Sequence, residues 1–146
     1  DHSTDPNEYA EFMLAVFQHM QSTYGFVPDT IEIVNEPDAN YQVGFNQWYF
    51  GTGARLGEMF AATRTRLQNA GFNPQFVIPA VTDMSNADLY FDNAIGIPGG
   101  GTTVLPYIKE ISYHRYLGVS PTELQNIVDR ATTNSKDTAM LVSGGI

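Results

Sequence analysis

The sequence predicts an α/β fold in which helices and short strands alternate along the chain. Four short apolar runs rich in β-branched residues have the composition of strands buried in a parallel sheet. The intervals between these runs carry apolar residues at helical spacing. With 146 residues and a hydrophobic content of 42%, the chain is sufficient for one domain with an apolar core, or for a piece of one.

The first helix is expected to begin at Pro6 and to end near Gly25. Asp5 is a capping residue, Pro6 takes the first helical position, and Glu8 stands three residues after the cap. The first strand follows at residues 30–34, where an apolar run contains a single charge. A strand of this kind is expected in the interior of a parallel sheet.

A second helix is predicted over about residues 45–69, and a second strand over residues 76–80. Pro79 has no N–H to donate to a neighbouring strand, so we expect it near the end of that strand. A short helix at residues 85–93 and a glycine-rich loop at 96–103 come next.

The third strand is predicted at residues 111–116 and the fourth at 139–142, with a helix between them that Ser120 and Pro121 open and that ends near residue 134. The strand starts leave room for one right-handed β-α-β crossover in each interval. A doubly wound sheet fits the same pattern, but no Gly-x-Gly-x-x-Gly turn follows a strand, so the mark of a nucleotide-binding version is missing.

The net charge and the residue content exclude several kinds of partner and chemistry. A formal charge of -9 disfavours nucleic acid and anionic membrane surfaces. There is no cysteine, and His2, His19 and His114 lack a metal-ligand spacing, so neither a metal nor another cofactor is predicted. A Gly-x-Ser-x-Gly nucleophile motif is also absent. The compartment stays open, with secretion favoured.

Glu36 is the strongest candidate for a catalytic residue. It follows an apolar strand directly, and Pro37 is expected to hold it in an extended conformation. A carboxylate at the carboxyl end of a buried strand lies where catalytic residues emerge in α/β barrels. The alternative is a polar turn with Glu36 as a solvated acid.

The run Ile31-Glu32-Ile33-Val34-Asn35-Glu36-Pro37-Asp38 resembles the fourth strand of clan A glycoside hydrolases, which are TIM-type (β/α)8 barrels. The resemblance implies that Glu36 is the general acid/base of a retaining β-glycosidase or endo-glycanase, and that Asn35 binds the sugar hydroxyl next to the reacting carbon. It also implies an oligosaccharide or polysaccharide substrate.

The resemblance extends in outline from the third barrel helix to the seventh strand, so the expected fold is a partial barrel with about four parallel strands. His114 and Tyr116 stand where these enzymes place His and Tyr at the end of strand six. Alternate residues of a strand face the same side, so both are expected to line the sugar cleft. The alternative for His114 is a satisfied histidine in the core.

Two further residues are candidates for sugar contacts. Asp83 follows the second strand and is expected either to reach a hydroxyl or to cap the next helix. Trp48, with Tyr41 and Tyr49, stands after the catalytic strand and is a candidate stacking platform, although core packing is the commoner role for each of these rings.

The second carboxylate that retaining hydrolysis requires is not found where the resemblance predicts it. Strand seven should end with a nucleophilic Glu, but Val142, Ser143 or Gly144 takes that position. Three explanations follow: a fragment of a longer barrel, a replaced nucleophile, or a protein that binds sugar without cleaving it. The absence of four barrel strands favours the fragment, so we expect the chain to be inactive alone and to associate with the rest of its own barrel or with another copy.

Overall fold

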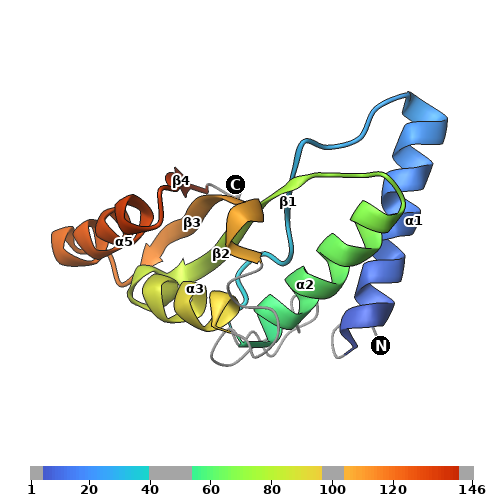
Figure 1. The fold of residues 1–146 in the computed structure, drawn as a ribbon. Coiled ribbons are helices and arrows are strands. Elements are labelled where there is room, and N and C mark those ends of the chain that lie inside the picture. The colour runs from blue at the N-terminus through green and yellow to red at the C-terminus, as the bar shows by residue number, and fades with distance from the viewer. Residues whose placement is uncertain (1–4, 40–53, 97–103, 142–146) are drawn as a thin grey trace.

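The computed structural model describes residues 5–39, 54–96 and 104–141. Within these ranges helices and strands alternate (Figure 1). Their order is α1 (Pro6–Tyr24), β1 (Thr30–Glu32), α2 (Ala54–Asn69), β2 (Gln75–Asp83), α3 (Ala87–Ile95), β3 (Ile108–Leu117), α5 (Pro121–Thr133) and β4 (Asp137–Met140), with short 3-10 helices at Met84–Asn86 and Leu105–Tyr107.

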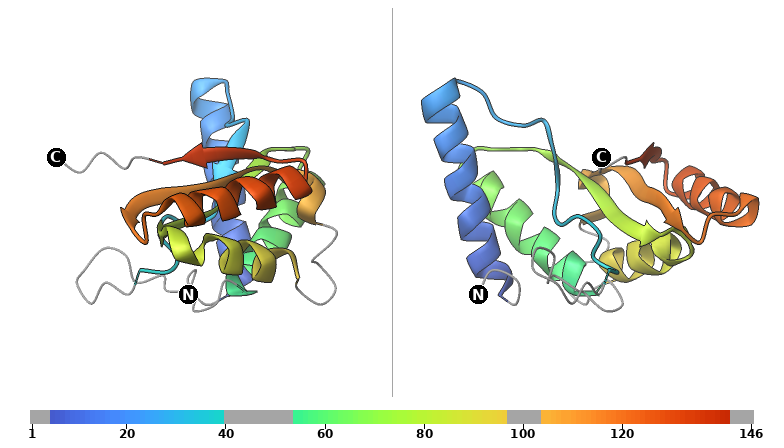
Figure 2. Two further views of the ribbon diagram at one scale, coloured as in Figure 1. Left: turned by 90° about the vertical axis from the view of Figure 1, so that its left-hand side faces the viewer. Right: turned by 180° about the vertical axis from the view of Figure 1, so that it is seen from behind.

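The strands form one parallel sheet in the order β1-β2-β3-β4, so neighbours in the sequence are neighbours in the sheet. The helices contact one another in the same order, α1 with α2, α2 with α3, and α3 with α5. Figures 1 and 2 show α2, α3 and α5 following one another along one side of the sheet. A doubly wound sheet reverses its strand order and carries helices on both faces, and neither feature occurs in the part described. The prediction of an α/β fold with a parallel sheet is confirmed.

The helix ends were predicted well because their capping residues are explicit. The Asp5 carboxylate accepts the backbone N–H of Asn7 at 2.8 Å, and Gly25 ends α1 in the left-handed region at φ 76°. The Ser120 hydroxyl accepts the N–H of Glu123 at 3.1 Å at the start of α5. These contacts fix the two ends of α1 and the start of α5.

The core lies between the sheet and the helices. On α2 the buried side chains return every three or four residues, as an amphipathic helix requires. The largest fully buried side chains are Tyr90, Phe17, Phe60, Phe76, Phe91, Leu56, Met59, Leu67, Ile78, Met84, Ile108 and Ile111. The rings of Phe60 on α2 and Phe76 on β2 are 4.0 Å apart between centroids, so this pair joins the helix layer to the centre of the sheet.

The strand boundaries differ from the prediction. β1 ends at Glu32, two residues early, and β4 begins and ends about two residues early. β2 continues to Asp83, so the expectation that Pro79 lies near the strand end was wrong. The register shifts between Pro79 and Val81, and the N–H of Ala80 is bonded by the Ser112 hydroxyl at 3.0 Å. This irregularity lets a proline occupy an inner strand.

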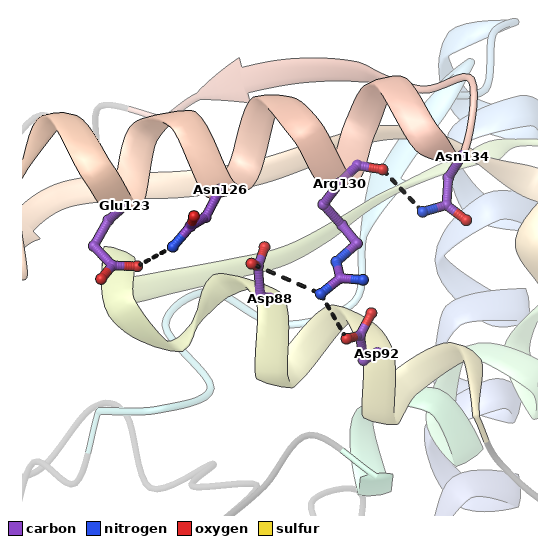
Figure 3. Close-up of polar contacts among 6 residues, drawn as sticks. All are labelled: Asp88, Asp92, Glu123, Asn126, Arg130 and Asn134. Carbon is purple, nitrogen blue, oxygen red and sulfur yellow. Dashed lines mark hydrogen bonds and ion pairs between the residues drawn. The ribbon is translucent and has the colours of Figure 1, made fainter.

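Polar side chains lie along α3 and α5, and those of Arg130, Asp88 and Asp92 meet between the two helices (Figure 3). We call this set the α3–α5 polar layer, and its members are Asp88, Asp92, Glu123, Asn126, Arg130 and Asn134. Its central contact is the ion pair of Arg130 with Asp92 at 3.0 Å, and Asp88 lies 3.8 Å from the same guanidinium nitrogen. The layer therefore bridges the two helices mainly through one arginine.

No helix in the described ranges is both long enough and apolar enough to span a lipid bilayer.

Candidate functional site

Glu36 lies in the loop that follows β1, and its conformation corrects two of the expectations above. Its φ is 54°, so it is left-handed rather than extended, and its residue is only 8% exposed, so it is not a solvated acid. Its N–H donates to the Ala80 carbonyl at 3.0 Å, and its carbonyl accepts the N–H of Ala39 at 3.0 Å. These two bonds form a turn around Pro37 that outweighs the extended preference of a residue before proline.

The left-handed conformation of Glu36 is matched by that of its partner. Ala80 has a φ of 56°, and a non-glycine residue in this region costs on the order of 1–3 kcal/mol. The two strained residues are bonded directly, Glu36 to Ala80, and Ala80 is bonded in turn to Ser112 on β3. The loop after β1 is thus linked to the second half of β2, and β2 in turn to the middle of β3.

Asp38 anchors the same loop to the end of β2. One carboxylate oxygen accepts the N–H of Thr82 at 2.7 Å, and the other accepts the N–H of Asp83 at 3.0 Å and the amide of Asn86 at 3.0 Å. Because both oxygens are occupied, Asp38 acts as a structural support. It keeps Asn35 and Glu36 over the carboxyl end of the sheet.

Asn35, His114 and Tyr116 come together although β2 separates their strands in the sheet. Nε2 of His114 lies 3.0 Å from Oδ1 of Asn35. The rings of His114 and Tyr116 are stacked, with centroids 5.0 Å apart and planes 18° apart. This stacking confirms that the two residues share a face. With Glu36 and Asp38, these three residues are called the strand-end site below.

His114 is 1% exposed, whereas Tyr116 is 46% exposed. Nδ1 of His114 is buried and has no hydrogen-bond partner among the residues that the structure describes. Buried polar atoms are usually paired, so this nitrogen distinguishes His114 from a histidine whose hydrogen bonds are all satisfied within the core. The partly exposed Tyr116 covers one face of the imidazole and fixes its plane.

Glu32 adds a second carboxyl group to the end of β1. Burial, followed by the negative charge of Glu36, raises the pKa of Glu32 from 4.5 to about 7. Glu32 in turn contributes, after burial, to raising the pKa of Tyr9, whose hydroxyl donates to the carbonyl of Ile33. Near neutral pH the region around Glu36 therefore holds a carboxyl group that is partly protonated, a property often found at functional sites.

Of its two expected roles, Asp83 fills the capping role. Its carboxylate accepts the N–H and the hydroxyl of Ser85 at 3.0 and 2.6 Å. Contact with a sugar stays a prediction for this residue. Trp48, Tyr41 and Tyr49 lie outside the described residues, so the stacking platform also stays a prediction.

Comparison with known protein families, with curated proteins and with solved structures found no match. Inferences about function therefore rest on the residues of the site and their geometry. Within the described ranges, no three His, Asp or Glu side chains are grouped so that they could hold a metal ion.

Glu32, Asp38 and Ser112 were not singled out from the sequence. Glu32 has a visible signal, a lone acid in an otherwise apolar strand, which indicates a carboxyl group forced into a low-dielectric site. Asp38 follows Pro37 directly, and an acid in a turn is a common partner for backbone N–H groups. Ser112 has no such signal, because its role depends on a register shift in the neighbouring strand.

Proposed function

We propose that this chain is part of a retaining glycoside hydrolase of the β-glycosidase or endo-glycanase type, built on a (β/α)8 barrel. The observation that carries the proposal is the contact of 3.0 Å between Asn35 and His114, beside the buried Glu36. It joins the two motif segments at the carboxyl ends of parallel strands, the face on which barrel enzymes place their active sites. The sequential strand order with helices along one side also suits a barrel.

In this proposal Glu36 exchanges protons with the substrate. As the acid, it protonates the glycosidic oxygen while a second carboxylate attacks the anomeric carbon, so the bond to the leaving sugar breaks and a glycosyl ester forms. As the base, it then takes a proton from water, which attacks the same carbon and releases the second carboxylate. Asn35 binds the hydroxyl next to that carbon, and Tyr116 offers a ring edge to the sugar.

The second carboxylate is the part of the reaction that this chain does not supply at the expected position. Val142, Ser143 and Gly144 follow β4 where the nucleophile would stand. None of them can form a glycosyl ester in the way a carboxylate does. The chain alone is therefore expected to hydrolyse no β-glycoside at an appreciable rate.

An assay with an activated aryl β-glycoside tests this function. The chain alone should be inactive, and the same residues joined to the remaining barrel strands, including a Glu at the end of strand seven, should be active. Glu36→Ala in the joined protein should lose turnover and recover it with azide, giving a β-glycosyl azide, because azide needs no general base. Efficient turnover by the chain alone, or full activity of Glu36→Ala without azide, would refute the proposal.

The residues that take the expected nucleophile position, Val142, Ser143 or Gly144, favour one second candidate, a sugar-binding or scaffolding protein that retains the barrel without the chemistry. The two candidates differ in the role of Glu36, which is the acid/base in the enzyme and has no catalytic role in the binding protein. Oligosaccharide binding that is unchanged in Glu36→Gln, together with inactivity of every joined protein, would favour this binding protein.

A further inference from the structure

A pocket opens where β3 leads into α5, near the carboxyl ends of β2 and β3. Its volume is about 190 Å³, and we call it the α5 pocket. The residues that line it are Met84, Arg115, Val119, Ser120, Pro121 and Leu124. Four of these side chains are apolar, one is a hydroxyl and one is a guanidinium. The α5 pocket therefore combines apolar walls with a single positive charge.

Both sides of the α5 pocket are held in place by contacts within the chain. On the β2 side, Asp83 caps the 3-10 helix that begins at Met84, and its carboxylate accepts the N–H of Ser85 at 3.0 Å. The loop after β3 packs closely on that cap, because a Cβ at Gly118 would stand 2.0 Å from the Asp83 carboxylate. On the other side, Ser120 caps α5. The pocket is therefore formed before a ligand arrives, as small-molecule sites usually are.

Arg115 reaches the α5 pocket because successive residues of a strand face opposite sides. Its neighbours His114 and Tyr116 stack within the strand-end site, so Arg115 points to the other side of β3. Arg66 and Arg130 form ion pairs with acids of neighbouring helices, whereas Arg115 is exposed and forms none with the residues that the structure describes. The α5 pocket is thus distinct from the strand-end site and contains a cation that a ligand can pair.

The lining restricts which ligands the α5 pocket accepts. A planar guanidinium binds a carboxylate through two parallel hydrogen bonds, a stronger contact than one with a neutral group. Apolar walls favour an apolar body, and a cavity of about 150 Å³ between apolar side chains is sufficient for benzene in another protein. The sulfur of Met84 also makes favourable contacts with aromatic rings. A single aromatic ring that carries a carboxylate meets all of these conditions.

We propose that the α5 pocket binds a small aryl carboxylate, with its carboxylate on the Arg115 guanidinium and its ring against Met84, Val119 and Leu124. Binding at this site does not depend on the function proposed above. A sugar acid presents the same carboxylate, but its ring carries several hydroxyl groups. The lining offers them one hydroxyl, that of Ser120, so most of them would be left without partners, which is costly.

Titration of the labelled chain with sodium benzoate, followed by nitrogen and methyl NMR, tests the site. Signals of the Arg115 guanidinium and of the Met84 and Leu124 methyl groups should shift together, with a Kd of about 1 mM for a ligand this small. Benzamide keeps the ring without the charge, and acetate keeps the charge without the ring. Each of these, and D-glucuronate as the sugar-acid probe, should bind about tenfold more weakly than benzoate or worse.

Two pairs of variants separate the charge from the wall. Arg115→Gln removes the charge and should weaken benzoate binding about tenfold. Arg66→Gln is its control, because this arginine lies on α2 and pairs with Glu11, so the affinity should be unchanged. Leu124→Ser removes part of the wall and should weaken binding about threefold. Val128→Ser, one turn further along α5, is its control, because the two side chains are similarly exposed, at 37% and 39%, and Val128 does not line the pocket.

Several results would overturn the proposal. Benzamide that binds as tightly as benzoate, or full benzoate affinity in Arg115→Gln that is folded by circular dichroism, would exclude the guanidinium as the anchor. D-Glucuronate that binds more tightly than benzoate would exclude the aryl body. Shifts confined to residues outside the lining, or no shift at about 50 mM benzoate, would exclude the site itself. Sugar binding at the strand-end site is tested separately, so failure of either proposal leaves the other standing.

Discussion

The strand-end site and the α3–α5 polar layer both gather polar side chains, and they hold them in different ways. At the strand ends Glu36 and His114 are buried. Backbone bonds with Ala80 and Ala39 hold Glu36, and the Asn35 side chain contacts His114. In the α3–α5 polar layer the paired charges of Arg130 and Asp92 are about a third or more exposed (Figure 3). Exposed pairs contribute little to stability. The strand-end site is therefore expected to contribute more to stability than the α3–α5 polar layer.

The largest effect should come from Asp38, which supports the strand-end site. Asp38→Ala removes the acceptor for two backbone N–H groups, those of Thr82 and Asp83, and for the amide of Asn86. The free energy of unfolding should fall by about 3 kcal/mol or more, measured by urea denaturation. Asp38→Asn keeps one acceptor oxygen and should lose about half as much. A loss below about 1 kcal/mol in Asp38→Ala would contradict the role of Asp38 as a structural support.

Gly118 tests how tightly the loop after β3 packs on the end of β2. A Cβ at Gly118 would stand 2.0 Å from the Asp83 carboxylate and 3.0 Å from the N–H nitrogen of Ser85, at a φ of 61°. Gly118→Ala should cost about 2–3 kcal/mol by thermal or urea unfolding. Gly25→Ala is the matched control, because its φ is 76° with no atom within 4 Å, and only the backbone cost of about 1 kcal/mol applies. Equal losses of unfolding free energy in the two variants would show that the Asp83 side chain moves away from the added methyl group at little cost.

Glu32 makes the stability of the strand-end region depend on pH. Its pKa is raised from 4.5 to about 7, so the folded state binds a proton more tightly than the unfolded state. Stability should be highest below about pH 4.5 for this group and should fall as the pH rises through 7. After screening by solvent, the loss should be on the order of 1–2 kcal/mol.

Glu32→Gln is the test of that dependence. The variant should be flatter than wild type between pH 4.5 and 8 in urea denaturation, and more stable than wild type at pH 8. Glu8→Gln, on the exposed side of α1, is the control and should leave the profile unchanged. A profile of Glu32→Gln parallel to that of wild type would contradict the raised pKa.

The smallest effect is expected in the α3–α5 polar layer. Burial raises the pKa of Asp88, and the nearby Arg130 opposes that rise. Arg130→Met keeps most of the apolar stem and removes the ion pairs, so stability should fall by about 0.5–1 kcal/mol at low salt. The difference from wild type should shrink further in concentrated salt. A loss as large as that of Asp38→Ala would contradict the claim that the α3–α5 polar layer contributes less to stability than the strand-end site.

Much of the fold could be predicted from residues that are close together in the sequence, whereas parts of the site could not. Asp5, Gly25 and Ser120 are capping residues whose preferences act within one helical turn, so the ends of α1 and the start of α5 were predicted closely. The extent of β2 depends instead on a register shift at Ala80, which involves the Ser112 hydroxyl of another strand. A pattern within a single strand has no information about that partner.

The site shows the same division. That His114 and Tyr116 share a face follows from strand alternation and was predicted. The conformation of Glu36 was predicted wrongly, because the preference of a residue before proline is weaker than the two backbone bonds from Ala80 and Ala39. The contact of Asn35 with His114 joins two strands that a third strand separates, and only the folded arrangement brings them together.

Whether sugar binds at the strand-end site is tested most directly by an amide and side-chain NMR titration of the chain with a soluble β-linked tetrasaccharide such as cellotetraose. We expect the signals of Asn35, Glu36, His114 and Tyr116 to shift together with one affinity, and those of Asp92 and Arg130 to stay unchanged. Shifts confined to α3 and α5, or no shift of these four residues at saturating sugar, would contradict sugar binding at this site.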